Sequence, residues 1–65
     1  MRVEVNGETR DVEAATLARL LAELGYGEGP VATAVNHEFV RARDREETPL
    51  RDGDAVEIVS PRQGG

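Results

Sequence analysis

The residues of this sequence best suited to chemistry are its last two, Gly64 and Gly65. Glycine lacks a Cβ, so two glycines in succession form a thin segment that bends freely. Such a segment can enter a narrow pocket and present an unhindered terminal carboxylate to another protein. Because most chain ends fray and have no function, this interpretation requires a compact body from which the segment emerges.

Other polar residues that could form a site are better explained as turns. His37 is the only histidine and falls in a predicted polar turn, with no serine or cysteine beside it to act as a nucleophile. Asp52, Asp54 and Glu57 partly resemble calcium ligands, but they lack the spacing of an EF-hand loop and lead into a strand. No glycine-rich phosphate loop follows a strand. We therefore expect no bound cofactor, no metal and no catalytic group in the chain itself.

Composition excludes several classes of protein. The chain has 65 residues with 13 acidic and 8 basic side chains, a net charge of −5, two aromatic residues and no cysteine. The absence of cysteine removes disulfides, thiolate metal sites and cysteine nucleophiles. The acidic charge and the shortage of aromatic residues argue against nucleic acid as a partner. The apolar runs are too short to span a membrane, so we expect the protein to be cytoplasmic. We also expect it to be a monomer when free.

The first half of the sequence predicts a hairpin followed by a helix. Alternating apolar and charged residues over 1–5 are typical of a half-buried strand, and Asn6-Gly7 is a favoured pair for a tight hairpin turn into a second strand over 8–12. Thr16 is a suitable helix N-cap and Gly25 a suitable residue for the helix end. The apolar stripe between them has helical spacing and consists of Leu17, Leu20, Leu21 and Leu24.

The second half predicts three strands and few large apolar side chains. A polar turn at 36–38 separates the first two strands, and a charged, solvated stretch at 44–48 precedes a lone apolar anchor, Leu50. Gly53 supplies the positive φ of a turn before the last strand. The three predicted strands span residues 31–35, 39–43 and 55–59.

One helix can cover only one face of one sheet, so these elements predict an α+β domain. The most apolar alternating strands are the first and the last, which places both centrally and parallel to each other. This is the β-grasp, or ubiquitin-like, architecture, with a mixed sheet of four to five strands on one main helix. We expect residues 1–60 to form the domain and residues 61–65 to form a flexible C-terminal tail.

The sheet face away from the helix is the expected docking surface. Alternation along the strands directs a small set of apolar side chains to this face, with charged residues around them. We predict that Arg62, at the start of the tail, also contacts the partner. The predicted docking residues are Ala32, Ala34, Ala55, Val59 and Arg62.

Three segments together resemble the ThiS-type sulfur carrier family of thiamine biosynthesis. These are the opening strand with its Asn turn, the sequence Ala34-Val35-Asn36 followed by Val40, and the stretch from Leu50 through Asp54 to the Gly64-Gly65 end. The resemblance spans the whole chain. The order and spacing of the three segments make the similarity more specific than any one of them.

The resemblance implies a mechanism that centres on Gly65. A ubiquitin-activating-like adenylyltransferase would use ATP and magnesium to convert the Gly65 carboxylate into an acyl-adenylate. A sulfur donor, supplied by a cysteine desulfurase or similar protein, would then displace AMP and leave a thiocarboxylate. Thiazole synthase would take the sulfur into the thiazole ring. In this scheme the chain is a carrier protein and co-substrate, not an enzyme.

Two departures from the family pattern leave other functions open. Arg41 stands where a proline is common, and Pro61-Arg62-Gln63 replaces apolar residues before the glycines. The position of Pro61 resembles that of a proline in the tail of the small subunit of molybdopterin synthase. A small subunit of this kind is therefore the second interpretation. Sulfur carriers for tRNA thiolation or cysteine synthesis share the fold and the ending. A ubiquitin-like modifier that forms isopeptides with lysines, and a β-grasp interaction domain, are alternatives of a different class.

Overall fold

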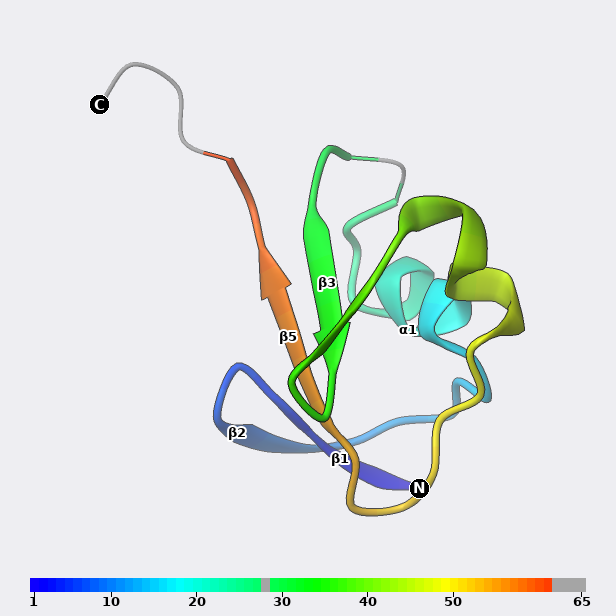
Figure 1. Cartoon of the computed structure of the whole chain (residues 1–65). Coiled ribbons are helices and arrows are strands. Elements are labelled where there is room, and N and C mark those ends of the chain that lie inside the picture. The colour runs from blue at the N-terminus through cyan, green and yellow to red at the C-terminus, as the bar shows by residue number, and fades with distance from the viewer. Residues whose placement is uncertain (28, 62–65) are drawn as a thin grey trace.

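The structure, a computed structural model, describes residues 1–27 and 29–61, and these form a five-stranded sheet with one α-helix and one 3₁₀-helix. Figure 1 shows both helices on the same side of the sheet. In chain order the elements are β1 (Arg2–Val5), β2 (Glu8–Asp11), α1 (Leu17–Glu23), β3 (Ala32–Val35), β4 (Glu38–Val40), η1 (Ala42–Glu47) and β5 (Ala55–Val59).

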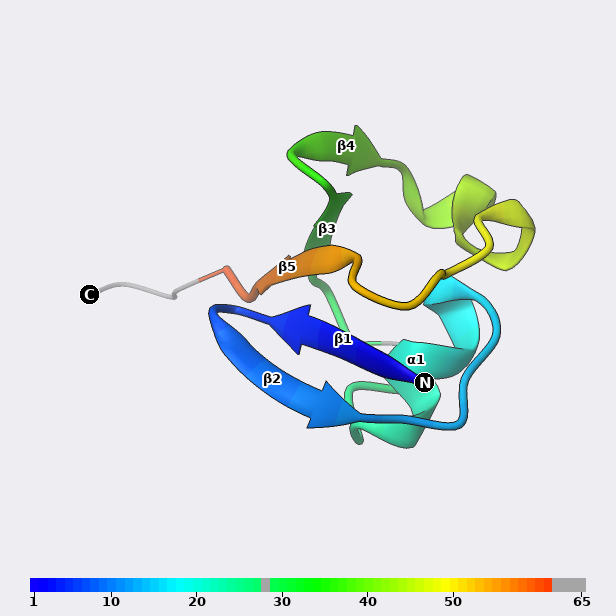
Figure 2. The same ribbon diagram turned by 90° about the horizontal axis from the view of Figure 1, so that it is seen from below.

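The sheet has the strand order β2-β1-β5-β3-β4. β1 and β5 pair in parallel, with Glu4 opposite Ala55 and Val5 opposite Val56, whereas the other three pairings are antiparallel. Figure 2 shows the five strands side by side in this order. The prediction that the first and last strands are parallel neighbours is therefore confirmed, and with it the β-grasp arrangement.

The first hairpin forms where the sequence predicts it. Val3 and Val5 are buried while Arg2 and Glu4 are exposed, as expected for a strand with one face on the core. Asn6 has φ 51° and Gly7 has φ 86°, so both central residues of the turn are left-handed. Asn-Gly suits such a turn because asparagine and glycine tolerate positive φ at the smallest cost.

Helix α1 is held at both ends as the sequence predicts. Thr16 Oγ1 accepts a hydrogen bond from Arg19 N at 3.2 Å, which caps the first turn. At the other end Gly25 has φ 90°, Gly25 N donates to Ala22 O at 3.2 Å, and Tyr26 N donates to Leu21 O at 2.9 Å. These two bonds are the Schellman pattern, which satisfies the last carbonyls of a helix.

The core lies between α1 and the inner face of the sheet. Leu17 and Leu20 are fully buried, and Leu21 is nearly so, whereas Leu24 is partly buried at the margin. Leu50 is also buried, as predicted for the single apolar residue of its segment. The buried apolar residues are Val3, Val5, Val12, Ala14, Leu17, Leu20, Leu21, Leu50, Val56 and Ile58.

The segment after the second hairpin differs from the prediction. β4 ends at Val40, so the strand expected over 39–43 is shorter, and residues 42–47 form η1 instead of a solvated loop. Three charged or polar contacts stabilise this turn of 3₁₀-helix. Arg41 Nε donates to Asp44 Oδ2 at 3.2 Å, Thr48 Oγ1 donates to Asp44 O at 2.7 Å, and Arg45 reaches the sheet. The loop was predicted because this segment is highly charged. The sequence pattern does not indicate that the Arg45 side chain is hydrogen-bonded to Thr33 and Val31.

None of the helices within the described residues is long and apolar enough to cross a membrane.

Candidate functional site

Strand β5 leads directly towards the C-terminal residues that the sequence singles out. β5 ends at Val59, and Ser60 and Pro61 follow it at the surface. Proline has no N–H to donate to a sheet, so Pro61 is compatible with the end of the ladder. The predicted tail spans residues 61–65, and of these the structure describes only Pro61. The predicted site residues Gly64 and Gly65 and the predicted contact residue Arg62 therefore lie outside the described residues.

The four described residues of the predicted docking surface lie on one face of the sheet. Ala32 is directly opposite Val59 across the β3–β5 pair, and cross-strand partners share a face. Ala34 is opposite Glu57 in the same pair, and Ala55 is opposite Glu4 in the β1–β5 pair. Their inner-face neighbours, such as Thr33 and Ile58, are buried, so this set faces away from α1.

The outer set has one large exposed side chain at the end of β5. Val59 is 61% exposed, Ala32 is exposed, and Ala34 and Ala55 are half-buried. The charged residues around them are Arg2, Glu4 and Glu57. The face is therefore a small apolar surface with a charged border, next to the point where the chain leaves the sheet.

Phe39 belongs to the same face and was not predicted as part of it. Phe39 is opposite Ala34 across the β3–β4 pair and is 69% exposed, the highest exposed fraction among the large apolar residues of the described chain. The residues Asn36 and His37, with φ 51° and 71°, form the two-residue turn that sets this register. If the sequence analysis had predicted a two-residue loop at Asn36-His37, that loop would have placed Phe39 opposite Ala34. We refer to Ala32, Ala34, Phe39, Ala55 and Val59 as the outer apolar face.

His37 is an exposed turn residue, in agreement with the interpretation of the sequence. Its Nδ1 lies 3.9 Å from Glu57 Oε1, and both side chains are more than half exposed. A contact of this length between exposed groups adds little stability. Among residues 1–27 and 29–61, no group of three or more His, Cys, Asp or Glu side chains is arranged to hold a metal ion.

A shallow apolar pocket of about 340 Å³ adjoins the outer apolar face at the end of β5. Two of its residues, Ala32 and Val59, are members of that face. The other three are Pro30, Val31 and Pro61. Because Pro61 is the last described residue, this pocket lies beside the start of the tail, where a partner that held the tail would also be close.

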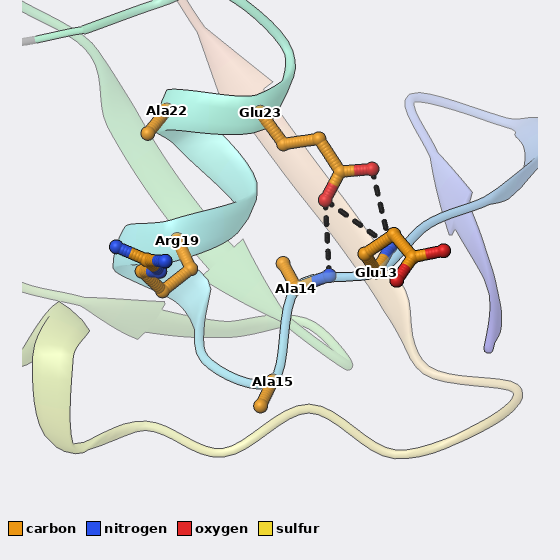
Figure 3. Close-up of a pocket in the computed structure, with 6 residues that line it drawn as sticks. All are labelled: Glu13, Ala14, Ala15, Arg19, Ala22 and Glu23. Atoms are coloured by element: carbon orange, nitrogen blue, oxygen red, sulfur yellow. Dashed lines mark hydrogen bonds between the residues drawn. The ribbon is translucent and has the colours of Figure 1, made fainter.

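A second pocket lies beside α1, and the Glu23 side chain that lines it stabilises the neighbouring loop and does not form a binding site. Figure 3 shows the Glu23 carboxylate turned from the helix towards the loop that precedes it. Glu23 Oε1 accepts hydrogen bonds from Glu13 N at 3.1 Å and from Ala14 N at 2.9 Å, and Oε2 also accepts from Glu13 N at 3.1 Å. The carboxylate is thus occupied in fixing the β2–α1 loop.

Comparison with known proteins gives a consistent result. A sequence model described as the ThiS family matches residues 3–65. The sulfur carrier protein ThiS of Thermus thermophilus is 43% identical over 63 residues, which cover 97% of this chain and 98% of that protein. A thiazole synthase of Paramagnetospirillum magneticum is 38% identical over 66 aligned residues, which cover all of this chain and 20% of that protein.

Solved structures resemble the fold along its full length. The crystal structure of a thiamine biosynthesis protein (ThiS) from Geobacter metallireducens has a TM-score of 0.83 and 30% identity, and each chain covers 100% of the other. An NMR structure of a thiamine biosynthesis protein from the same organism has a TM-score of 0.80 and 30% identity, and covers all of this chain and 88% of that one.

Proposed function

The chain belongs to the ThiS family, and from this premise we propose that the carboxylate of Gly65 is the group on which it carries sulfur. The protein is a sulfur carrier of thiamine biosynthesis and not an enzyme. Two observations support Gly65 as the working residue. The family match extends to residue 65, and β5, a strand paired on both sides, is the last described element before it in the sequence.

The proposed chemistry begins with activation by a separate adenylyltransferase. The Gly65 carboxylate attacks the α-phosphate of Mg-bound ATP, pyrophosphate leaves, and an acyl-adenylate forms. A carboxylate is a poor electrophile until it gains such a leaving group. The terminal sulfur of a persulfide, carried by a donor such as a cysteine desulfurase, then attacks the acyl carbon and expels AMP, and a thiol reductant cleaves the S–S bond of the resulting acyl disulfide; free sulfide would need no reductant. The product is a thiocarboxylate, whose sulfur is a strong nucleophile.

Thiazole synthase is the proposed acceptor of the sulfur. The similarity of the whole chain to one fifth of a thiazole synthase supports this partner. We also propose an adenylyltransferase and a sulfur donor as partners, because the carboxylate must be activated before sulfur can be added to it. Since this chemistry consumes ATP, we propose the cytoplasm as its location.

The outer apolar face is the surface that we propose for docking to the adenylyltransferase. It lies on the side of the sheet opposite α1 and reaches the end of β5 at Val59, so a partner bound there would be close to the start of the tail. A partner that holds this face and receives the tail at the same time would orient the carboxylate, which lowers the entropic part of the activation barrier.

The test is direct conversion of the terminus. The full chain is incubated with its adenylyltransferase, ATP, magnesium and sulfide, and its intact mass is measured. We expect an increase equal to the mass difference between sulfur and oxygen, and fragmentation should place the change on Gly65. A Gly65→Ala variant adds a Cβ in a pocket expected to be narrow, so conversion should fall about 100-fold, the scale associated with a misplaced reacting group.

Ser60→Ala provides the matched control, because Ser60 is an exposed residue outside the terminal pair. It should be converted like the unaltered chain. Thiazole formation that persists after deletion of Gly65 would refute the proposal. A product linked to lysines of other proteins would assign the chain to the ubiquitin-like modifiers instead.

A further inference from the structure

The strand that leads into the tail is fixed by two asparagine side chains, one near each end. Asn6 is hydrogen-bonded to the backbone of Ile58, near the end of β5, through both polar atoms of its side chain. Asn36 is bonded to the backbone of Ala55, the first residue of β5. Both asparagines lie in hairpin turns with φ 51°. Because the two asparagines are similar, Asn36 can serve as a reference for the contribution of Asn6, which lies near the C-terminal end of β5.

The Asn6 side chain continues the parallel ladder between β1 and β5 where the backbone of β1 can no longer do so. Glu4 N donates to Asp54 O and Asn6 N donates to Val56 O, both at 2.9 Å. The next bonds come from the side chain, since Asn6 Nδ2 donates to Ile58 O at 3.1 Å and Ile58 N donates to Asn6 Oδ1 at 2.9 Å. A side-chain amide has the same donor and acceptor as a peptide group, so it acts as one further residue of β1.

The geometry explains why a side chain is needed at this point. The β1 backbone turns away at Asn6-Gly7 to begin the hairpin, so the β1–β5 register ends at Val5 opposite Val56. Figure 2 shows this turn, between β1 and β2, beside the C-terminal end of β5. On the other side, β3 pairs with β5 as far as Val59. Asn6 therefore gives Ile58 partners on the β1 side, three residues before Pro61.

We propose that Asn6 is a positioning residue of the carrier, which holds the end of β5 between β1 and β3 and so fixes the direction in which the tail leaves the sheet. This inference rests on the proposed function of Gly65 and adds to it a residue far away in sequence. The tail must enter a partner while the sheet face is docked. A strand end held on both sides restricts the directions in which the tail can start.

Loss of this restraint should change the rate of activation more than the binding of the carrier. The outer apolar face is formed by other side chains, so docking should persist without the Asn6 amide. Once docked, however, a less restrained strand end would place the terminal carboxylate correctly in a smaller fraction of encounters. This is a loss of orientation, which lowers kcat and leaves KM almost unchanged.

Asn6→Gly and Asn36→Gly form a matched pair of variants. Glycine accepts the positive φ of both turns without strain, so each variant removes only a side chain. Each removes two hydrogen bonds, because Asn36 Oδ1 accepts from Ala55 N at 3.0 Å and Asn36 Nδ2 donates to Asp54 Oδ1 at 3.1 Å. The two changes therefore remove the same number of hydrogen bonds, in one case both at Ile58 and in the other at Ala55 and at Asp54, which immediately precedes β5.

The first measurement is amide hydrogen exchange of the free proteins by NMR. Asn6→Gly should accelerate exchange at Ile58 and leave Ala55 protected, and Asn36→Gly should do the reverse. The second measurement is pyrophosphate release by the adenylyltransferase, at a temperature where all variants are folded. Asn6→Gly should lower kcat about tenfold with KM within about twofold, whereas Asn36→Gly should keep the kcat of the unaltered chain.

Asn6→Asp completes the test. Aspartate keeps an acceptor for Ile58 N but replaces the donor to Ile58 O with a second acceptor oxygen, so its kcat should also fall below that of asparagine. Equal kcat for the two glycine variants, or unchanged exchange at Ile58, would overturn the inference. If the unaltered chain is not adenylated at all, the proposed function fails instead, and the exchange experiment still decides whether Asn6 holds the end of β5.

Discussion

Arg45 donates a hydrogen bond through Nε to Thr33 Oγ1 at 3.1 Å, which joins η1 to the middle of β3. The same guanidinium donates through Nη2 to Val31 O at 2.6 Å. Thr33 Oγ1 in turn donates to Val40 O at 2.8 Å, and Thr33 is 2% exposed, the only buried polar residue in the described part of the chain. Arg45 thus connects the helical segment directly to β3 and, through Thr33, indirectly to β4.

We predict that Arg45→Met destabilises the fold by about 1–3 kcal/mol, the usual cost of leaving a buried hydrogen-bonding group without its partner. Methionine retains an apolar stem of similar length, so the loss should reflect the guanidinium and not packing. The free energy of unfolding from urea titration gives the measurement. Arg43→Met is the control, because Arg43 is exposed on the same 3₁₀ segment and should change stability by less than about 0.5 kcal/mol. Equal losses would show that Arg45 is not an anchor.

The sequence predicts most of this fold because each element has its own local signal. Alternation, the Asn6-Gly7 turn, the leucine stripe and Gly25 are all short-range features, and the structure agrees with each of them. The parallel β1–β5 pair followed from a global argument, that the first and last strands are the most apolar and therefore central in the one sheet that the helix covers. The outer positions of Ala32, Ala34, Ala55 and Val59 followed in turn from alternation.

What the sequence did not predict depends on contacts between distant residues. η1 is stabilised by the reach of Arg45 to β3, and no local pattern in 42–47 indicates this contact. Phe39 was missed as part of the outer apolar face because the hairpin register depends on whether the turn has two or three residues. The role of Asn6 was also missed, since an Asn-Gly pair is fully explained by its turn until its side-chain bonds to Ile58 are seen.

We next predict that the leucine stripe determines whether this domain folds at all. Leu20 is 0% exposed, and Leu20→Ala should cost about 2–5 kcal/mol through lost burial and a residual cavity. Such a loss is a large part of the stability of a small domain. Thermal melting followed by circular dichroism should show a much lower Tm or a partly unfolded chain at 25 °C. Leu24→Ala, at the partly buried margin of the stripe, should cost less; a comparable loss would contradict this account of the core.

The last prediction concerns the outer apolar face, and it separates docking from folding. Val59 is 61% exposed beside the start of the tail, so Val59→Asp should leave the free energy of unfolding within about 1 kcal/mol, as is usual for surface changes. In the bound state the new carboxylate would lose water without gaining a partner, which is unfavourable. The KM for the adenylyltransferase should therefore rise about tenfold or more, corresponding to about 1.4 kcal/mol, while kcat changes little.

Ala22→Asp is the matched control for Val59→Asp, because Ala22 is exposed on α1, which covers the opposite face of the sheet. It introduces the same charge without altering the outer apolar face, so its KM should equal that of the unaltered chain. This comparison removes the general effect of one more negative charge on an acidic protein, which acts on association from any position. A rise in KM of the same size in both variants would assign the effect to net charge, and an unchanged KM for Val59→Asp would place the docking surface elsewhere.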